Sequence, residues 1–291
     1  MRAALPPPPP AVFRIAAQLR DLRGVVCVVW GARKTKNRWF KEPCISVHVK
    51  KKRLRHRLKD QLLPPTIDGY RLDVLEVGVP KPHGLGVRSR IDAGPLGVST
   101  ATAVAAKGAD ALALLSGHGA LNAANGQIQL IASDDSFPGE VVDGAFGGGL
   151  SLDWALANFP GGAGAADATH PLVDASAPIP LANGLVPGEM LEQYSEERGL
   201  FVDGILQGTV LGQVSLGPDI YTSLLSIVSR VGGEPFSVPG DSGSLVVDAD
   251  RRAVGAIVGG KSELHVFYAY DLARLRGALP LSRYRLFFED T

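Results

Sequence analysis

Beyond residue 90 the sequence is a succession of short apolar runs separated by turn residues, and this pattern restricts the possible folds most strongly. Runs such as ALALL (111–115), GQIQLIA (126–132) and AVGAIVGG (253–260) are too short for ordinary globular helices, and no useful helical period lies between them. The 35 glycines and 21 prolines of the 291-residue chain supply many turns. Many short strands at this spacing predict an all-β sandwich or barrel.

The first 79 residues show a different pattern. Residues 1–11 form a proline-rich lead-in that we expect to be extended and solvated. Apolar spacing in residues 12–79 predicts a helix, two strands, a short helix and a strand, in that order. The expected positions are a helix over 12–22, strands over 25–30 and 44–50, a helix over 54–62, and a strand after the turn at 68–69. This order describes a small α+β module.

Charge divides the chain at the same place. Residues 1–79 carry 17 Lys and Arg against 6 Asp and Glu, a net +11, whereas residues 80–291 carry 13 against 23, a net −10. The opposite signs predict two modules, with a Pro- and Gly-rich linker at 80–90 and the second module over 91–291. The basic module is therefore a candidate for docking on the acidic one.

A strongly basic run, KKKRLRHRLK, occupies residues 50–59. Its composition suits a phosphate-binding patch, which leaves nucleic acid as a possible partner. We favour the simpler interpretation, in which these charges are the solvated face of the helix expected over 54–62.

Targeting and cofactor signals are missing from the sequence. The N-terminus MRAALPPPPPAVF has neither the apolar region nor the cleavage site of a signal peptide, and no run approaches about 18 apolar residues. We therefore expect a soluble cytoplasmic protein without a membrane partner.

Cys27 and Cys44 lie in apolar strand-like runs, which favours buried free thiols over a disulfide. Two cysteines are too few for a cysteine-based metal site, and we expect neither metal nor cofactor.

The stretch VPGDSGSLVV (238–247) places Ser242 in a tight turn before a buried strand. Such a serine is either an ordinary turn residue or a nucleophile. A nucleophile needs a histidine to accept its proton and a carboxylate to orient that histidine. Of the six histidines, His118 is the best candidate, because the turn SGHG places it directly after an apolar strand, where an imidazole can face a cleft.

Two aspartates compete for the position of the acid. Asp153, in SLDWALANF, has strand-like surroundings and leaves room for a long connection before the strands around 200–215. Asp174, in PLVDASAPIP, lies in a stretch broken by prolines. We prefer Asp153 and keep Asp174 as the alternative acid.

These segments together resemble the trypsin-like serine peptidases, which have the chymotrypsin fold. LLSGHGAL, SLDWALANF and PGDSGSLVV are similar to the family's histidine, aspartate and serine segments, and the order His118, Asp153, Ser242 is that of the chymotrypsin fold. The resemblance covers about residues 90–291. The first module is similar to an N-terminal module that precedes some bacterial and plant members. Together, these resemblances imply an all-β double barrel of the chymotrypsin type, preceded by a small α+β module.

The resemblance also implies a role for each residue of the site. Ser242 would attack the scissile carbonyl, His118 would take and return its proton, and Asp153 would hold His118. The backbone N–H groups of Gly240 and Ser242 would form the oxyanion hole. Asp241 is expected in a buried ion pair that supports this loop.

Substrate preference is expected to depend on a pocket at Phe236, six residues before the serine, and on Gly259 and Gly260. The two glycines belong to the strand segment that, by resemblance, pairs with the substrate backbone. Phe236 supplies no carboxylate, so we expect a small or apolar side chain in the pocket rather than Lys or Arg.

The predicted function is a serine endopeptidase that cleaves a protein or peptide substrate through an acyl-enzyme intermediate, in limited proteolysis of a partner protein. Two alternatives stay open. One is a catalytically inactive peptidase fold that serves as an interaction protein. The other is a nucleic-acid-binding regulator that uses the basic run at 50–59.

Overall fold

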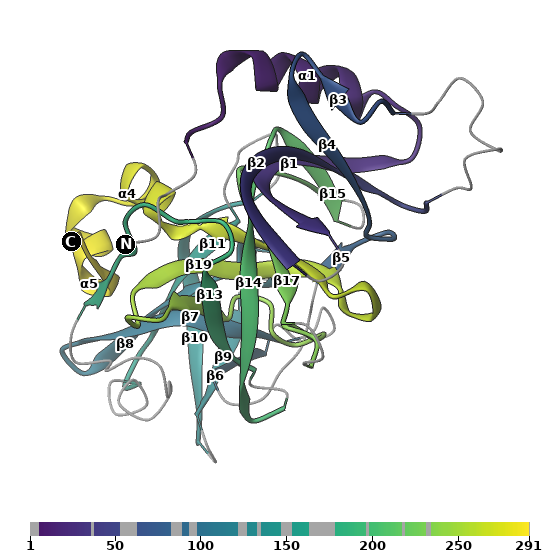
Figure 1. Cartoon of the computed structure of the whole chain (residues 1–291). Coiled ribbons are helices and arrows are strands. Elements are labelled where there is room, and N and C mark those ends of the chain that lie inside the picture. The colour runs from purple at the N-terminus through teal and green to yellow at the C-terminus, as the bar shows by residue number, and fades with distance from the viewer. Residues whose placement is uncertain are drawn as a thin grey trace.

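The computed structural model describes the backbone of residues 6–35, 38–52, 63–82, 89–92, 98–121, 127–132, 135–146, 153–162, 178–195, 198–216, 219–230 and 234–290. Strands dominate this part of the chain, and its helices are short (Figure 1). None of the described helices is long and apolar enough to cross a membrane.

The first barrel is closed by six of the described strands, in the order β10–β11–β8–β7–β6–β9. They are β6 (Ser89–Asp92), β7 (Val98–Lys107), β8 (Asp110–Leu115), β9 (Gln127–Ala132), β10 (Asp135–Ala145) and β11 (Trp154–Phe159). The ALALL run explains why β8 is buried on both faces. Ala111, Ala113 and Leu115 pack inside the barrel, whereas Leu112 and Leu114 face the core shared with the second barrel.

The second barrel uses six described strands in the order β13–β18–β19–β20–β17–β14, and pairing of β13 with β14 closes the circuit. They are β13 (Met190–Ser195), β14 (Leu200–Val210), β17 (Leu224–Ser229), β18 (Leu245–Asp248), β19 (Ala253–Lys261) and β20 (Val266–Asp271). Its interior holds large side chains such as Phe236, Ile257 and Phe267. The predicted all-β double barrel is confirmed.

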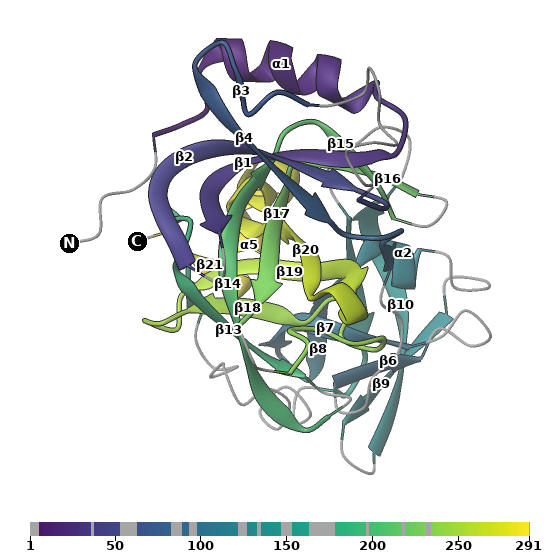
Figure 2. The same ribbon diagram turned by 45° about the vertical axis from the view of Figure 1, so that its right-hand side comes forward.

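The N-terminal residues extend the sheet of the second barrel rather than folding apart from it. Strand β1 (Val25–Thr35) pairs with β14, and β2 (Arg38–Val49), β4 (Tyr70–Glu76) and β3 (Thr66–Ile67) follow outward. Helix α1 (Pro10–Arg20) lies over these strands (Figure 2) and packs Val12, Ile15, Ala16 and Leu19 on them. The predicted first helix and three strands are therefore confirmed, while the helix expected over 54–62 lies outside the described residues.

The remaining elements connect or cover the barrels. Strand β5 (Lys81–Pro82), within the predicted linker, pairs with β19, and β12 (Ile179–Pro180) pairs with β21 (Phe288–Glu289). Strands β15 (Gln213–Leu216) and β16 (Asp219–Thr222) form a separate pair. The short helices are α2 (Gly117–Ala120), η5 (Ser262–Leu264), η6 (Leu272–Arg274), α4 (Leu275–Ala278) and α5 (Leu281–Phe287). The exact domain boundaries stay predictions.

The junction between β1 and β14 requires glycine on both strands. Gly31 pairs with Gly208, and a Cβ atom on Gly31 would lie 2.0 Å from the Gln207 carbonyl oxygen. A Cβ atom on Gly208 would lie 2.2 Å from the Trp30 carbonyl oxygen. Any side chain at either position would force the two backbones apart.

A buried polar network joins the same two parts of the sheet. His48 of β2 contacts the Tyr268 hydroxyl through Nδ1 (2.9 Å) and the Gln207 Oε1 through Nε2 (3.1 Å). The Tyr268 hydroxyl also lies 3.5 Å from the Cys27 Sγ, and both cysteines are buried free thiols, as predicted. Burial lowers the pKa of His48 to about 3, so its imidazole is neutral in the folded protein.

We predict that Gly31→Ala lowers the free energy of unfolding by about 3 kcal/mol, because the added methyl group overlaps the β14 backbone. Gly277→Ala is the matched control, since a Cβ atom at Gly277 in α4 meets nothing within 4 Å. It should leave stability unchanged or raise it by less than about 1 kcal/mol. Urea unfolding measures both values, and equal values for the two variants would contradict the close approach.

We also predict a pH dependence of stability that originates in His48. The unfolded chain protonates His48 near pH 6.5, whereas the folded chain does so only near pH 3, so stability is lost as the pH falls between these values. His48→Gln removes this titration and should flatten the slope of unfolding free energy between pH 6 and 4 by about 1.4 kcal/mol per pH unit. Identical slopes in the two proteins, measured by urea unfolding across this range, would refute the assignment.

Candidate active site

The three residues singled out in the sequence come from both barrels and meet at their junction. His118 lies in α2, directly after β8, and Asp153 directly precedes β11. Strands β8 and β11 are paired through Leu115 and Ala155, which brings the two residues side by side. Ser242 lies in the loop of residues 237–244 before β18, which we call the nucleophile loop.

Hydrogen bonds link these side chains in a row. The Asp153 carboxylate accepts the His118 backbone N–H through Oδ1 and contacts His118 Nδ1 through Oδ2, both at 2.6 Å. His118 Nε2 lies 2.7 Å from the Ser242 Oγ. Because the carboxylate can only accept, Nδ1 carries a proton, and in the neutral imidazole Nε2 is free to accept from Ser242.

Burial fixes this row in place. Asp153 is 2% exposed and Ser242 is fully buried, while the His118 side chain keeps 10% of its surface exposed. Gly117 permits the tight turn, because a Cβ atom there would lie 3.0 Å from Asp153 Oδ1. The imidazole therefore has one well-defined position between acid and serine.

Two closed barrels of six strands, with the histidine and aspartate from the first and the serine from the second, define the architecture. The chain has the chymotrypsin fold. The resemblance proposed from the sequence segments is thus matched by the strand order.

Several solved structures that are similar to the chain are proteases. They include a glutamic-acid-specific serine protease (18% identity, covering 67% of this chain and 96% of that one, TM-score 0.46). Others are the active form of the Rv3671c protease from M. tuberculosis (15%, 67% and 76%, 0.44) and Thermobifida fusca protease A (13%, 67% and 94%, 0.45). No protein-family model and no curated protein matches the chain. The fold assignment depends on strand order rather than on these similarities.

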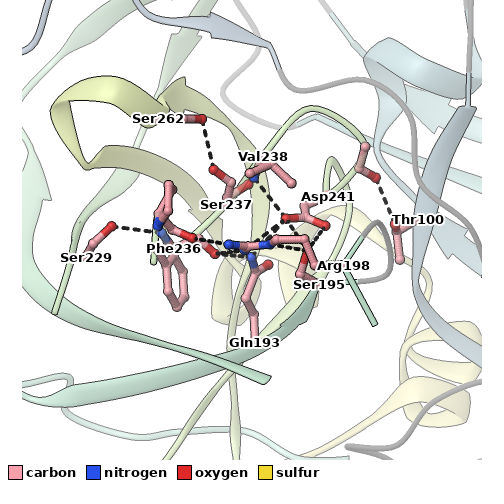
Figure 3. Close-up of polar contacts among 12 residues, drawn as sticks. Thr100, Gln193, Ser195, Arg198, Ser229, Phe236, Ser237, Val238, Asp241 and Ser262 are labelled. Carbon is pink, nitrogen blue, oxygen red and sulfur yellow. Dashed lines mark hydrogen bonds and ion pairs between the residues drawn. The ribbon is translucent and has the colours of Figure 1, made fainter. Parts of the chain in front are cut away.

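The nucleophile loop is built around the carboxylate of Asp241, which is completely buried (Figure 3). It accepts hydrogen bonds from the Val238 backbone N–H at 2.9 Å, from the Ser195 hydroxyl at 2.9 Å and from the Gln193 amide at 3.3 Å. Burial raises the pKa of Asp241, and these hydrogen bonds and the charge of Arg198 oppose that rise.

Arg198 is the cation of the ion pair expected for Asp241, with its Nη2 3.8 Å from Oδ2 of the carboxylate. Its other donors reach the Ser195 hydroxyl at 3.0 Å and the Pro235 carbonyl at 2.8 Å. The guanidinium therefore connects the end of β13 with the segment that enters the nucleophile loop, as Figure 3 shows.

Strand β7 of the first barrel holds the nucleophile loop from the other side. The Thr100 hydroxyl donates to the Gly240 carbonyl at 3.0 Å, and the Thr102 hydroxyl donates to the Gly243 carbonyl at 2.7 Å. Gly240 and Gly243 have φ angles of 112° and 88°, a region that favours glycine. Within the described residues, the N–H groups of Gly240 and Ser242 donate no hydrogen bond, whereas the Asp241 and Gly243 N–H groups do.

The sequence predicts that Phe236, Gly259 and Gly260 line the substrate pocket, and the structure places them in two different environments. Phe236 is fully buried, with its ring centroid 6.1 Å from that of Phe267 in the core of the second barrel. Gly259 and Gly260 lie in β19 and pair with β20 on one side and β5 on the other. Asp174 lies outside the described residues. Among the residues that the structure describes, no cluster of three or more metal-ligating side chains occurs.

Several residues of the site escaped the sequence analysis. Arg198, Thr100 and Thr102 support the loop, and the rings of Phe146 and Tyr221 flank His118 with centroids 6.1 and 6.4 Å from the imidazole. The threonines lie about 140 residues from their partners along the chain. No local pattern marks such residues, because their partners are determined only by how the two barrels pack.

We predict that Arg198→Met lowers the free energy of unfolding by about 3 kcal/mol, because it leaves the buried Asp241 carboxylate without its cation. Arg230→Met is the matched control. The Arg230–Asp203 pair is closer than the Arg198–Asp241 pair, at 3.1 Å, but its two side chains are 62% and 41% exposed. Arg230→Met should lower the free energy of unfolding by less than about 0.5 kcal/mol. Equal losses in urea unfolding would mean that Arg198 does not stabilise the loop through Asp241.

Proposed function

We propose that the protein is a serine endopeptidase that uses Ser242, His118 and Asp153 and forms an acyl-enzyme intermediate. The observation that carries this proposal is the row of hydrogen bonds from Asp153 through His118 to the Ser242 Oγ, at 2.6 and 2.7 Å. A serine in an ordinary turn has no need of an oriented imidazole and a buried carboxylate behind it.

In the proposed reaction, His118 Nε2 takes the Ser242 proton as Oγ attacks the scissile carbonyl carbon. The imidazolium then gives that proton to the leaving amine, and the acyl group stays on Oγ. In the second half, water attacks the ester carbonyl as Nε2 takes its proton. The imidazolium then returns that proton to Oγ as the acyl–Oγ bond breaks, which releases the carboxylic acid product and restores Ser242. Asp153 keeps its contact with Nδ1 throughout and stabilises the imidazolium.

The oxyanion of each tetrahedral intermediate needs donors that are not already used. The N–H groups of Gly240 and Ser242 suit this role, because the neighbouring N–H groups of the nucleophile loop donate to protein carbonyls while these two do not within the described residues. We therefore assign both to the oxyanion hole. The buried Asp241 and its donors keep the loop in this conformation.

The proposed substrate is a protein cleaved at a limited number of sites, after a small or apolar side chain. Phe236 supports this preference only by supplying no carboxylate for Lys or Arg. A cytoplasmic location and the docking role of the basic module stay predictions from the sequence.

Labelling with a fluorophosphonate probe tests the proposed function. Ser242→Ala should abolish labelling of the folded protein, and His118→Ala and Asp153→Asn should slow it by about 10³-fold or more, since each removes part of the base. Asp174→Asn is the matched control and should label at the wild-type rate.

Thermal unfolding confirms that each variant is folded. Labelling that survives in Ser242→Ala would place the nucleophile elsewhere. Loss of labelling in Asp174→Asn but not in Asp153→Asn would identify Asp174 as the catalytic acid. A folded wild-type protein that does not label would be an inactive peptidase fold, the interaction protein considered from the sequence.

A further inference from the structure

Strand β18 covers only part of the edge of β19. The ladder between them includes Leu245 opposite Ala256 and continues to Ile257, whose N–H donates to the Ser244 carbonyl at 3.0 Å. The Ile257 carbonyl in turn accepts the Gly243 N–H at 2.7 Å. At this point the chain turns into the nucleophile loop, so β18 does not reach Gly259 or Gly260.

The chain itself pairs with the part of β19 that β18 leaves uncovered. Pro82 lies opposite Gly259 and Lys81 opposite Gly260, in antiparallel register, and Figure 1 shows β5 beside this end of β19. Both β5 and β18 run antiparallel to β19, so they follow one another in the same direction along one edge. Going from Lys81 to Pro82, β5 is directed toward the nucleophile loop.

The distance between β5 and the nucleophile loop is short. Gly259 is two residues beyond Ile257, which corresponds to about 7 Å along an extended strand. A peptide that continues the direction of β5 along this edge therefore arrives beside Ser242. An uncovered strand edge with free N–H and C=O groups binds an extended peptide by adding it as a further strand.

We infer that the intact chain blocks its own active site, because β5 occupies the edge of β19 on which the substrate backbone is expected to pair. The inference rests on the proposed function. A substrate must displace Lys81 and Pro82 before its backbone pairs with Gly259 and Gly260. The occupant of the site in the intact chain is thus an internal segment rather than a second molecule.

Strand β5 by itself would bind the edge of β19 weakly, and its attachment to the rest of the chain strengthens this binding. Pro82 has no N–H, so Lys81 and Gly260 form the pair able to exchange two hydrogen bonds. The segment is held close by Val77, which is fully buried and donates its N–H to the Val49 carbonyl of β2 at 2.9 Å. Attachment this short keeps β5 at a high effective concentration, so a two-residue strand competes with free substrate.

The test substitution removes the hydrogen-bond donor of β5. Lys81→Pro deletes the Lys81 N–H while keeping an extended backbone between Pro80 and Pro82. Thr66→Pro is the matched control, because β3 is also a two-residue edge strand that follows a proline, and it pairs with β4 away from the site. We expect kcat/KM on an unfolded casein substrate to rise about tenfold in Lys81→Pro and to stay at the wild-type value in Thr66→Pro.

A peptide added in trans provides a second measurement. Acetylated and amidated Gly-Val-Pro-Lys-Pro, the sequence of residues 78–82, should inhibit the Lys81→Pro variant. The same peptide with N-methyl-lysine carries the same charge but lacks the backbone donor, and it should inhibit at least tenfold less well. Equal inhibition by both peptides would show that the lysine charge, not strand pairing, is recognised, and would overturn the inference.

Fluorophosphonate labelling separates this inference from the proposed function. Equal labelling of wild type, Lys81→Pro and Thr66→Pro, with equal casein turnover, would leave the peptidase standing and overturn the block by β5. Labelling or turnover that rises only in Lys81→Pro supports the block. No labelling in any of the folded proteins would overturn the proposed function and the inference with it.

Discussion

The conformation of the nucleophile loop depends on one buried negative charge. Asp241 has no exposed surface, and a carboxylate in that position is costly unless every lone pair that faces protein has a donor. The Val238 N–H, the Ser195 hydroxyl, the Gln193 amide and the Arg198 guanidinium supply those donors from within the chain. The loop is therefore held by groups that are present as soon as β13 and the loop are folded, and its support requires no newly released N-terminus.

The N-terminal strands are connected to the same site through β5. Gly31 and Gly208 allow β1 to approach β14, and the His48 network fills the space between the module and the barrel with satisfied polar groups. This rigid attachment carries β4, and β4 leads within a few residues to β5 on the edge of β19. A module that could be regarded as an independent appendage is thus placed to control access to Ser242.

Sequence reasoning succeeded where the signal is local. Short apolar runs identified β8 and β19, helical spacing identified α1, and small turn residues identified the positions of His118 and Ser242. It left the acid open between Asp153 and Asp174, because both are aspartates next to apolar residues and local pattern does not report which one lies behind the imidazole. The structure brings Asp153 to His118, at 2.6 Å, while Asp174 lies outside the described residues.

Strand periodicity, turn chemistry and composition, which act over a few neighbouring residues, determined by themselves an all-β sandwich or barrel with an α+β module in front of it. The double barrel and the order His118, Asp153, Ser242 were what the resemblance of three sequence segments to the trypsin-like serine peptidases implied. Only the tertiary structure decided that β1 joins the sheet of the second barrel, that Arg198 and Thr100 support the nucleophile loop, and that Lys81 and Pro82 lie on the edge of β19. Each of these contacts joins segments far apart in the chain, and the packing of whole barrels, rather than any local preference, selects such partners.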